Sequence, residues 1–289
     1  SYIIERVILV RSIVSRITFQ GRNMSIKKII TGLTLSLLLA SGVASAADFN
    51  KGLNAFNSGD YKTALAEWIP LAEQGDVYTQ NFLGFTLSNG NDAIKDIKSA
   101  IKWYTLAAEQ GYVDSQYNLG VMYANGNGVL ENDKTAVKWY TLAAEQGHVD
   151  SQYNLGVMYA NGNGVLENDK TAVKWYTLAA EQGHVNAQFL LGFMYDQGYG
   201  VLENDKTALK WYTLAAEQGD ASAQSNLGSQ YRSGEGVLKD NQRAYMWFSI
   251  ASFNGNQAGD INKSSVVKEM TPADISKAQD MSSLCLESN

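Results

Sequence analysis

Apolar residues recur at helical spacing through most of the chain. Between Asp169 and Gly183 they fall at i, i+3, i+4, i+7 and i+8, on one broad helix face: Ala172, Trp175, Tyr176, Ala179 and Ala180. The preceding segment has the same character. We expect Asp150 to cap that helix and Gly162 to end it, because Asp accepts bonds from free N–H groups and Gly adopts left-handed backbone. The pattern predicts two helices joined by a short glycine-rich turn.

This pattern repeats every 36 residues. Tryptophan recurs at that period at Trp103, Trp139, Trp175, Trp211 and Trp247, and glycine recurs from Gly75 to Gly255. Five copies fill residues 76–255 without a gap, and residues 113–149 are identical to 149–185. A fixed period of this length is typical of a solenoid.

The repeat sets the fold class. A two-helix unit cannot bury its own apolar faces, so successive copies must stack. Gly156 and its equivalents lie inside a predicted helix, where Gly costs about 1 kcal/mol relative to Ala, and their recurrence indicates a close approach between helices. We therefore predict an all-α protein, an α/α superhelical solenoid of two-helix, 36-residue repeats.

The segments that flank the repeats are predicted to cap the stack. Residues 47–75 contain a short helix at Phe49–Asn57 and a helix from Tyr61, which we expect Pro70 to kink. Residues 256–289 form the C-terminal cap. There Thr271-Pro272-Ala273-Asp274 is a helix start signal, followed by an apolar stripe, and residues 256–270 suggest a further helix.

The N-terminal region has the three parts of a secretory signal peptide within residues 24–46. Lys27 and Lys28 precede the apolar stretch Ile29–Val43, and Ala44-Ser45-Ala46 provides small residues for cleavage after Ala46. Residues 1–23 are interpreted as an upstream extension, with a basic amphipathic membrane helix as the alternative. The sequence predicts a periplasmic or secreted protein with no membrane insertion after cleavage.

Charge and cysteine content exclude several classes of function. Six of the 23 basic residues but one of the 29 acidic residues fall within 1–46, which leaves 17 basic and 28 acidic side chains beyond them. So acidic a body repels phosphate backbones and anionic lipids, and we expect no nucleic-acid partner. With a single cysteine, Cys285, the chain can form neither an intrachain disulfide nor a Cys-based zinc site.

Several motifs of one copy agree with a known family in order and spacing. The copy contains Ser151-Gln152-Tyr153-Asn154-Leu155-Gly156, then Met158-Tyr159, Gly162-x-Gly164-Val165, Asp169-Lys170-x-Ala172, Trp175-Tyr176 and Ala179-Ala180-Glu181-Gln182-Gly183. This series resembles the Sel-1-like repeat (SLR) family, and the resemblance covers essentially all of the chain beyond the signal segment. It implies an α/α solenoid related to tetratricopeptide repeats and, usually, an adaptor for protein partners.

No residue pattern supports catalysis, a metal or a cofactor. His148 and His184 occupy equivalent loop positions without a third metal ligand nearby, and are interpreted as decoration copied by duplication. Ser99-x-x-Lys102 and Ser265-x-x-Lys268 fit one motif of penicillin-recognising enzymes, but Ser-Asp-Asn and Lys-Thr-Gly are absent. We expect no enzymatic activity and keep β-lactam binding as an alternative.

The candidate binding residues lie on the first helix of each copy. Leu155, Gly156 and Tyr159 hardly change between copies, whereas a second face of the helix does. We call that face the variable stripe: Phe82, Phe85, Asn89; Asn118, Val121, Asn125; Asn154, Val157, Asn161; Leu190, Phe193, Gln197; Asn226, Ser229 and Ser233. Likeness to tetratricopeptide repeats implies a concave position for it, with Asn118, Asn154 and Asn226 bonding an extended peptide and Phe189 and Phe193 forming an apolar pocket.

A second repeated feature is the acid near the end of each second helix. Glu73, Glu109, Glu145, Glu181 and Glu217 lie in the last turn, where the helix dipole disfavours negative charge. We hypothesise a compensating bond to the adjoining helix. Taken together, the sequence predicts a monomeric exported adaptor that binds a protein or peptide in the bacterial envelope, with a secreted factor that binds a host protein as the alternative.

Overall fold

The computed structural model describes residues 47–90 and 94–287, so residues 1–23, the predicted signal peptide and its cleavage site lie outside the described residues. The described part of the chain is helical and contains no strand. It divides into two compact units, one up to Gln110 and one from Gly111. Successive helices pack in pairs that repeat along each unit, which confirms the predicted all-α solenoid.

The described part of the first unit contains two helix pairs. They are α2 (Phe49–Asn57), α3 (Tyr61–Glu73), α4 (Val77–Asn89) and α5 (Ile97–Glu109). Helix α2 has the predicted bounds, and α3 continues through Pro70 to Glu73. An aromatic cluster fills the space between them: Phe82 contacts Trp68 edge-on at 4.8 Å between ring centroids, and Trp68 Nε1 donates to the Phe49 carbonyl at 3.1 Å.

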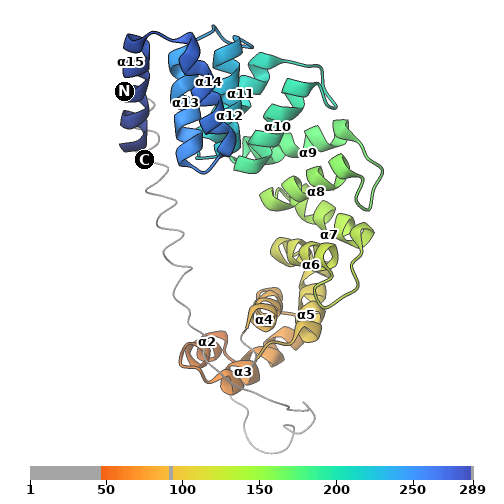
Figure 1. Ribbon diagram of the computed structural model, residues 1–289. Helices are drawn as coiled ribbons and strands as arrows, with labels where there is room; N and C mark the ends of the chain where they lie inside the picture. The colour runs from red at the N-terminus through yellow and green to blue at the C-terminus, as the bar shows by residue number, and fades with distance from the viewer. Residues whose placement is uncertain (1–46, 91–93, 288–289) are drawn as a thin grey trace, which may run out of the picture. The chain divides into compact units, whose positions relative to one another are not determined.

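The helices of the second unit follow one another in chain order in Figure 1. They are α6 (Val113–Asn125), α7 (Asp133–Glu145), α8 (Val149–Asn161), α9 (Asp169–Glu181), α10 (Val185–Gln197), α11 (Asp205–Glu217), α12 (Ala221–Ser233), α13 (Asn241–Phe253), α14 (Gln257–Val266) and α15 (Pro272–Glu287). Helices α14 and α15 lie within residues 256–289, where the sequence predicts a C-terminal cap that contains helices. Thr271 accepts at Oγ1 from the Asp274 N–H at 3.2 Å, and fully buried Ala278 of α15 packs in the core formed with α13.

Two glycines of each copy allow close packing. A Cβ added to Gly156 would lie 2.6 Å from the ring of Tyr176 on the second helix, so the Tyr ring packs directly on the first helix backbone. The loop glycine Gly164 has φ +70° and approaches the preceding copy, where an added Cβ would lie 2.6 Å from the Asp133 carbonyl oxygen. These contacts explain the recurring glycines as places of close approach.

A polar ladder links successive copies. Gln152 is buried and donates to the Ala144 carbonyl of the preceding copy at 3.1 Å, and its Oε1 accepts from Gln182 Nε2 at 2.7 Å. Equivalent amide pairs join Gln110 to Gln80, Gln146 to Gln116, Gln218 to Gln188 and Asn254 to Gln224. Each buried amide is thereby satisfied on both sides.

This ladder corrects the hypothesis about the repeated glutamates. The carboxylates of Glu145 and its equivalents are exposed, and the bond to the adjoining helix is made by the following Gln. Desolvation by neighbouring atoms raises the pKa of Glu217 above its ordinary value, which is the opposite of what a compensating bond would do.

The predicted cap of the repeat helix is also wrong by two positions. Helix α8 begins at Val149, so His148 is the N-cap and Asp150 lies in the first turn. His148 Nδ1 accepts from the Ser151 N–H at 3.2 Å. Gly162 ends the helix in left-handed backbone, as predicted.

Candidate functional site

The first helix of each copy has one constant, buried face. Its central leucines, Leu119, Leu155, Leu191 and Leu227, are at most 1% exposed, and its glycines contact the aromatic ring of the second helix. Because this face holds the copy together, it offers nothing to a ligand. The variable stripe lies on the other part of the same helices.

The last position of the variable stripe is exposed in every copy, the first is half-buried, and the middle position differs between copies. Asn89, Asn125, Asn161, Gln197, Ser229 and Ser233 are exposed, whereas Asn118, Asn154, Asn226, Val121, Val157 and Leu190 are half-buried. Val121 and Val157 pack at the edge of the buried clusters. The stripe therefore presents amides and hydroxyls with a thin apolar margin.

The half-buried asparagines face the tyrosines of the preceding copy. Burial raises the pKa of Tyr140, and a hydrogen bond with the Asn154 side chain offsets part of that rise. Asn226 lies near Tyr212, but Tyr212 Oη is buried without a well-formed hydrogen bond among the described residues. Asn154 is therefore held in place from one side by the Tyr140 hydroxyl.

The aromatic residues of the stripe do not share one environment. Phe189 is half-buried against Tyr212, with ring centroids 6.0 Å apart, whereas Phe193 is 38% exposed and contacts Tyr199 at 5.8 Å. Phe85 is 51% exposed, but Phe82 packs against Trp68 in the first unit. Phe193 with Tyr199 is thus the exposed aromatic contact of the second unit's stripe.

The two histidines are helix caps. His184 Nδ1 accepts from the Ala187 N–H at 3.2 Å, and its ring stacks on Tyr153 at 4.4 Å. His148 makes the same contacts with Ser151 and Tyr117. Their interpretation as loop decoration was incomplete, and the signal was available because Asp76, Asp220 and Asn256 occupy the same repeat position as caps.

The residues that suggested enzymatic chemistry have structural roles. Ser99 Oγ donates to Asp96 Oδ2 at 2.6 Å at the start of α5, and Lys102 lies over the Trp103 ring. Trp103, Trp139 and Trp211 are buried, which confirms that the tryptophans are packing residues.

Within residues 47–90 and 94–287, no three His, Cys, Asp or Glu side chains gather as metal ligands. None of the helices there is long and apolar enough to cross a membrane.

Periodicity did not reveal a row of exposed leucines. Leu130, Leu166, Leu202 and Leu238 lie in the loop between the two helices of a copy and are 88–91% exposed. Their position between the glycine turn and the cap of the next helix was the available signal. We call them the loop leucines, and they mark a surface distinct from the variable stripe.

Stacked helix pairs with a constant buried face and a variable exposed face define a helical-repeat solenoid protein. A family model for the Sel1 repeat matches residues 77–112, 113–148, 149–184, 185–220 and 221–256. These segments make up more than half of the chain, which therefore belongs to the Sel1 repeat family. Sel1 repeat proteins are generally scaffolds for protein–protein interaction.

Two solved structures are similar in sequence and fold. A protective antigen present in uropathogenic Escherichia coli strains, which displays an SLR fold, is 36% identical with a TM-score of 0.68, over 83% of this chain and 52% of its own. The present chain thus spans about half of that antigen. A Sel1 repeat protein from Oxalobacter formigenes is 32% identical with a TM-score of 0.65, over 82% of this chain and 97% of its own. None of the functionally curated proteins matches the chain.

Proposed function

We propose that this protein is an exported adaptor that binds a protein or peptide partner along the variable stripe and serves in the bacterial envelope. The observation that carries the proposal is the contrast between the two faces of the first helices. The buried face is nearly constant between copies, while the stripe changes residue type and remains accessible. Variation at accessible positions is typical of a recognition surface on a repeat scaffold.

The chemistry of the stripe suits an extended peptide. Asparagine amides both donate and accept, so Asn118 and Asn154 can pair with the free N–H and C=O groups of a peptide backbone. Phe193 and Tyr199 add an apolar contact in the fourth copy, and Ser229 with Ser233 adds hydroxyls in the fifth. The mixture favours sequence-selective binding of a polar chain with one apolar side chain.

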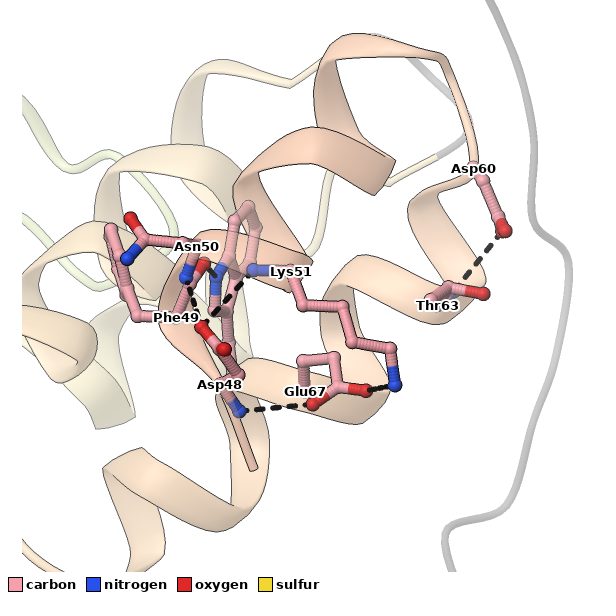
Figure 2. Close-up of polar contacts among 8 residues, drawn as sticks. Asp48, Phe49, Asn50, Lys51, Asp60, Thr63 and Glu67 are labelled. Carbon is pink, nitrogen blue, oxygen red and sulfur yellow. Dashed lines mark hydrogen bonds and ion pairs between the residues drawn. The ribbon is translucent and has the colours of Figure 1, made fainter. Parts of the chain in front are cut away.

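Export is supported by the contacts that hold the first described helices together. Asp48 caps α2 by accepting from the N–H groups of Asn50 and Lys51, and its own N–H donates to Glu67 at 3.0 Å (Figure 2). Lys51 also pairs with Glu67. None of these bonds involves a residue before Asp48, so cleavage after Ala46 would leave them in place.

The test of export is the intact mass of the protein purified from its own cells. We expect Ala47 as the first residue. Retention of Ile29–Val43 in protein recovered from a membrane pellet would contradict cleavage.

The test of partner binding is affinity capture from the envelope fraction with mass spectrometry of the bound proteins. We expect saturable enrichment of one partner that a variable-stripe variant loses. Equal recovery on both proteins would contradict the proposed surface.

A second candidate, binding of a host protein, is favoured by similarity to the E. coli protective antigen. Capture from a host-cell lysate but not from envelope extracts would favour it. Covalent labelling by a fluorescent penicillin would instead support the β-lactam alternative. The position of Ser99 does not favour that alternative, because its hydroxyl bonds Asp96 at the start of α5.

A further inference from the structure

The fifth copy and the C-terminal helices enclose a pocket of about 320 Å³. Its lining includes Ser229, Arg232 and Ser233 of α12, Asn262 of α14, and Glu269. Lys239 and Phe248 complete the lining. Since Ser229 and Ser233 belong to the variable stripe, the pocket is the place where the stripe ends.

The pocket carries two cations and one anion. Arg232 donates to Glu269 Oε1 through Nε at 3.0 Å and Nη2 at 2.6 Å, and Lys239 Nζ lies 3.1 Å from Glu269 Oε2. Hydrogen bonds from Arg232 and then Lys239 lower the pKa of Glu269, so its carboxylate is ionised at neutral pH. One carboxylate leaves a net positive charge and several unused N–H donors on the two cations.

This charge pattern is specific to the fifth copy. The positions of Arg232 and Lys239 hold Ser88 and Lys95 in the first copy, Ala124 and Glu131 in the second, Ala160 and Glu167 in the third, and Asp196 and Glu203 in the fourth. The fifth copy has a cation at both positions, in a chain whose formal net charge is -6. If the fifth copy only had to form an ion pair with Glu269, one cation would be enough, and the second is left over.

The other lining residues fit a chain end. The Asn262 amide and the Ser229 and Ser233 hydroxyls add polar groups to the lining, whereas Phe248 is 1% exposed and belongs to the core beneath it. A peptide that follows the variable stripe reaches the pocket at the last copy, where α14 and the turn at Glu269 close the path. Both Arg232 bonds to Glu269 end on one oxygen, Oε1, so the Nη1 group of the guanidinium keeps its donors for a second carboxylate.

We propose that this pocket binds the C-terminal carboxylate of a peptide lying along the variable stripe. The carboxylate contacts the free donors of Arg232 and Lys239 beside Glu269. This inference rests on the proposed function, because it names the end of the partner that the stripe holds.

The test uses amide NMR spectra of the isotopically labelled protein and two probes that differ only in their C-terminal group. These are N-acetyl-glycyl-leucine as the free acid and the same dipeptide as its C-terminal amide. We expect the acid to shift the amide signals of Ser229, Arg232 and Asn262 in a saturable manner, and the amide to bind at least ~10-fold more weakly. Absence of these shifts with the acid, or equal binding of the amide, would overturn the proposal.

Two variants separate binding from stability. Arg232→Gln should weaken the acid probe at least ~10-fold, whereas Glu269→Gln, which frees both cations, should tighten it about threefold or more. Arg243→Gln is the matched control, since Arg243 pairs with Asp240 at 3.5 Å outside the pocket lining and should leave binding unchanged. Weaker binding in Glu269→Gln with a native-like helical spectrum would overturn the proposal.

Acetate distinguishes a free carboxylate from a chain end. Acetate binding as strong as that of the dipeptide acid would assign the pocket to small carboxylates and overturn the peptide assignment. Failure of the probe with intact stripe-dependent capture of a partner would reject the pocket alone. Loss of partner capture with intact probe binding would instead indicate a failure of the proposed function.

Discussion

At the scale of single residues, the repeat uses interchangeable side chains for one task. The N-cap of the first helix is Asp76, His148, His184, Asp220 or Asn256 in different copies, and each accepts from the backbone N–H three residues later. A histidine can accept through Nδ1 only while that nitrogen carries no proton. The histidine caps therefore depend on pH, and the others do not at neutral pH.

We predict that His184→Asn reduces the loss of stability at mildly acidic pH. Burial, which outweighs attraction to Asp150, lowers the pKa of His184 below its ordinary value of 6.5. The unfolded chain then takes up the proton first, so this contribution is complete above pH 6.5 and disappears as the pH falls through the lower folded pKa. Chemical denaturation at pH 7.5 and pH 5 measures it, and we expect a difference of up to about 1 kcal/mol. An identical pH dependence in both proteins would contradict the cap assignment.

A second prediction concerns the amide ladder. Gln152→Leu should destabilise the protein by about 2 kcal/mol, because it removes two hydrogen bonds of a buried amide, one to the Ala144 carbonyl and one from the Gln182 amide. Glu145→Gln is the matched control, because Glu145 is the last residue of α7 and is followed by an amide of the ladder, Gln146. Its carboxylate is exposed in the last helical turn, so we expect no loss of thermal stability. A lower melting temperature for Glu145→Gln would restore the original hypothesis of a glutamate bond.

At the scale of helices and turns, the repeat period contained most of the information. Five copies of one pattern make the helix pairs, the glycine turns and the buried tryptophans evident, because each signal is seen several times. The bonding partners were less evident. Gln146 and Glu145 are adjacent polar residues, and periodicity alone cannot show which one bonds the first helix of the same copy. The loop leucines were missed because an apolar residue in a repeat is ordinarily assigned to the core.

The two kinds of glycine make a prediction at this scale. Gly183 has φ +91° with no atom near an added Cβ, so Gly183→Ala should cost about 1–2 kcal/mol from backbone strain alone. Gly164→Ala combines φ +70° with overlap of the Asp133 carbonyl and should cost about 1–3 kcal/mol more. Urea denaturation of both variants checks the order. Equal losses would show that the loop does not need close contact with the preceding copy.

At the scale of the whole molecule, the account depends on one division of labour. The constant face of the first helices builds the stack, the variable stripe is the surface that we propose binds a partner, and the loop leucines form a separate surface. The stripe could be predicted from the sequence as a varying helix face. Its contact with the tyrosines of the preceding copy could not, because that depends on how two copies pack.

The most direct test of this claim compares partner capture by three variants. Asn118→Ala with Asn154→Ala removes two stripe amides and should weaken capture at least ~10-fold, about 1.4 kcal/mol. Tyr140→Phe removes the hydroxyl beside Asn154 but keeps the amide, so it controls for lost packing, and Leu130→Ser with Leu166→Ser alters the other surface. We predict that the last two proteins capture the partner as the parent does. Capture that survives loss of the asparagines but fails with the leucine variant would contradict the account.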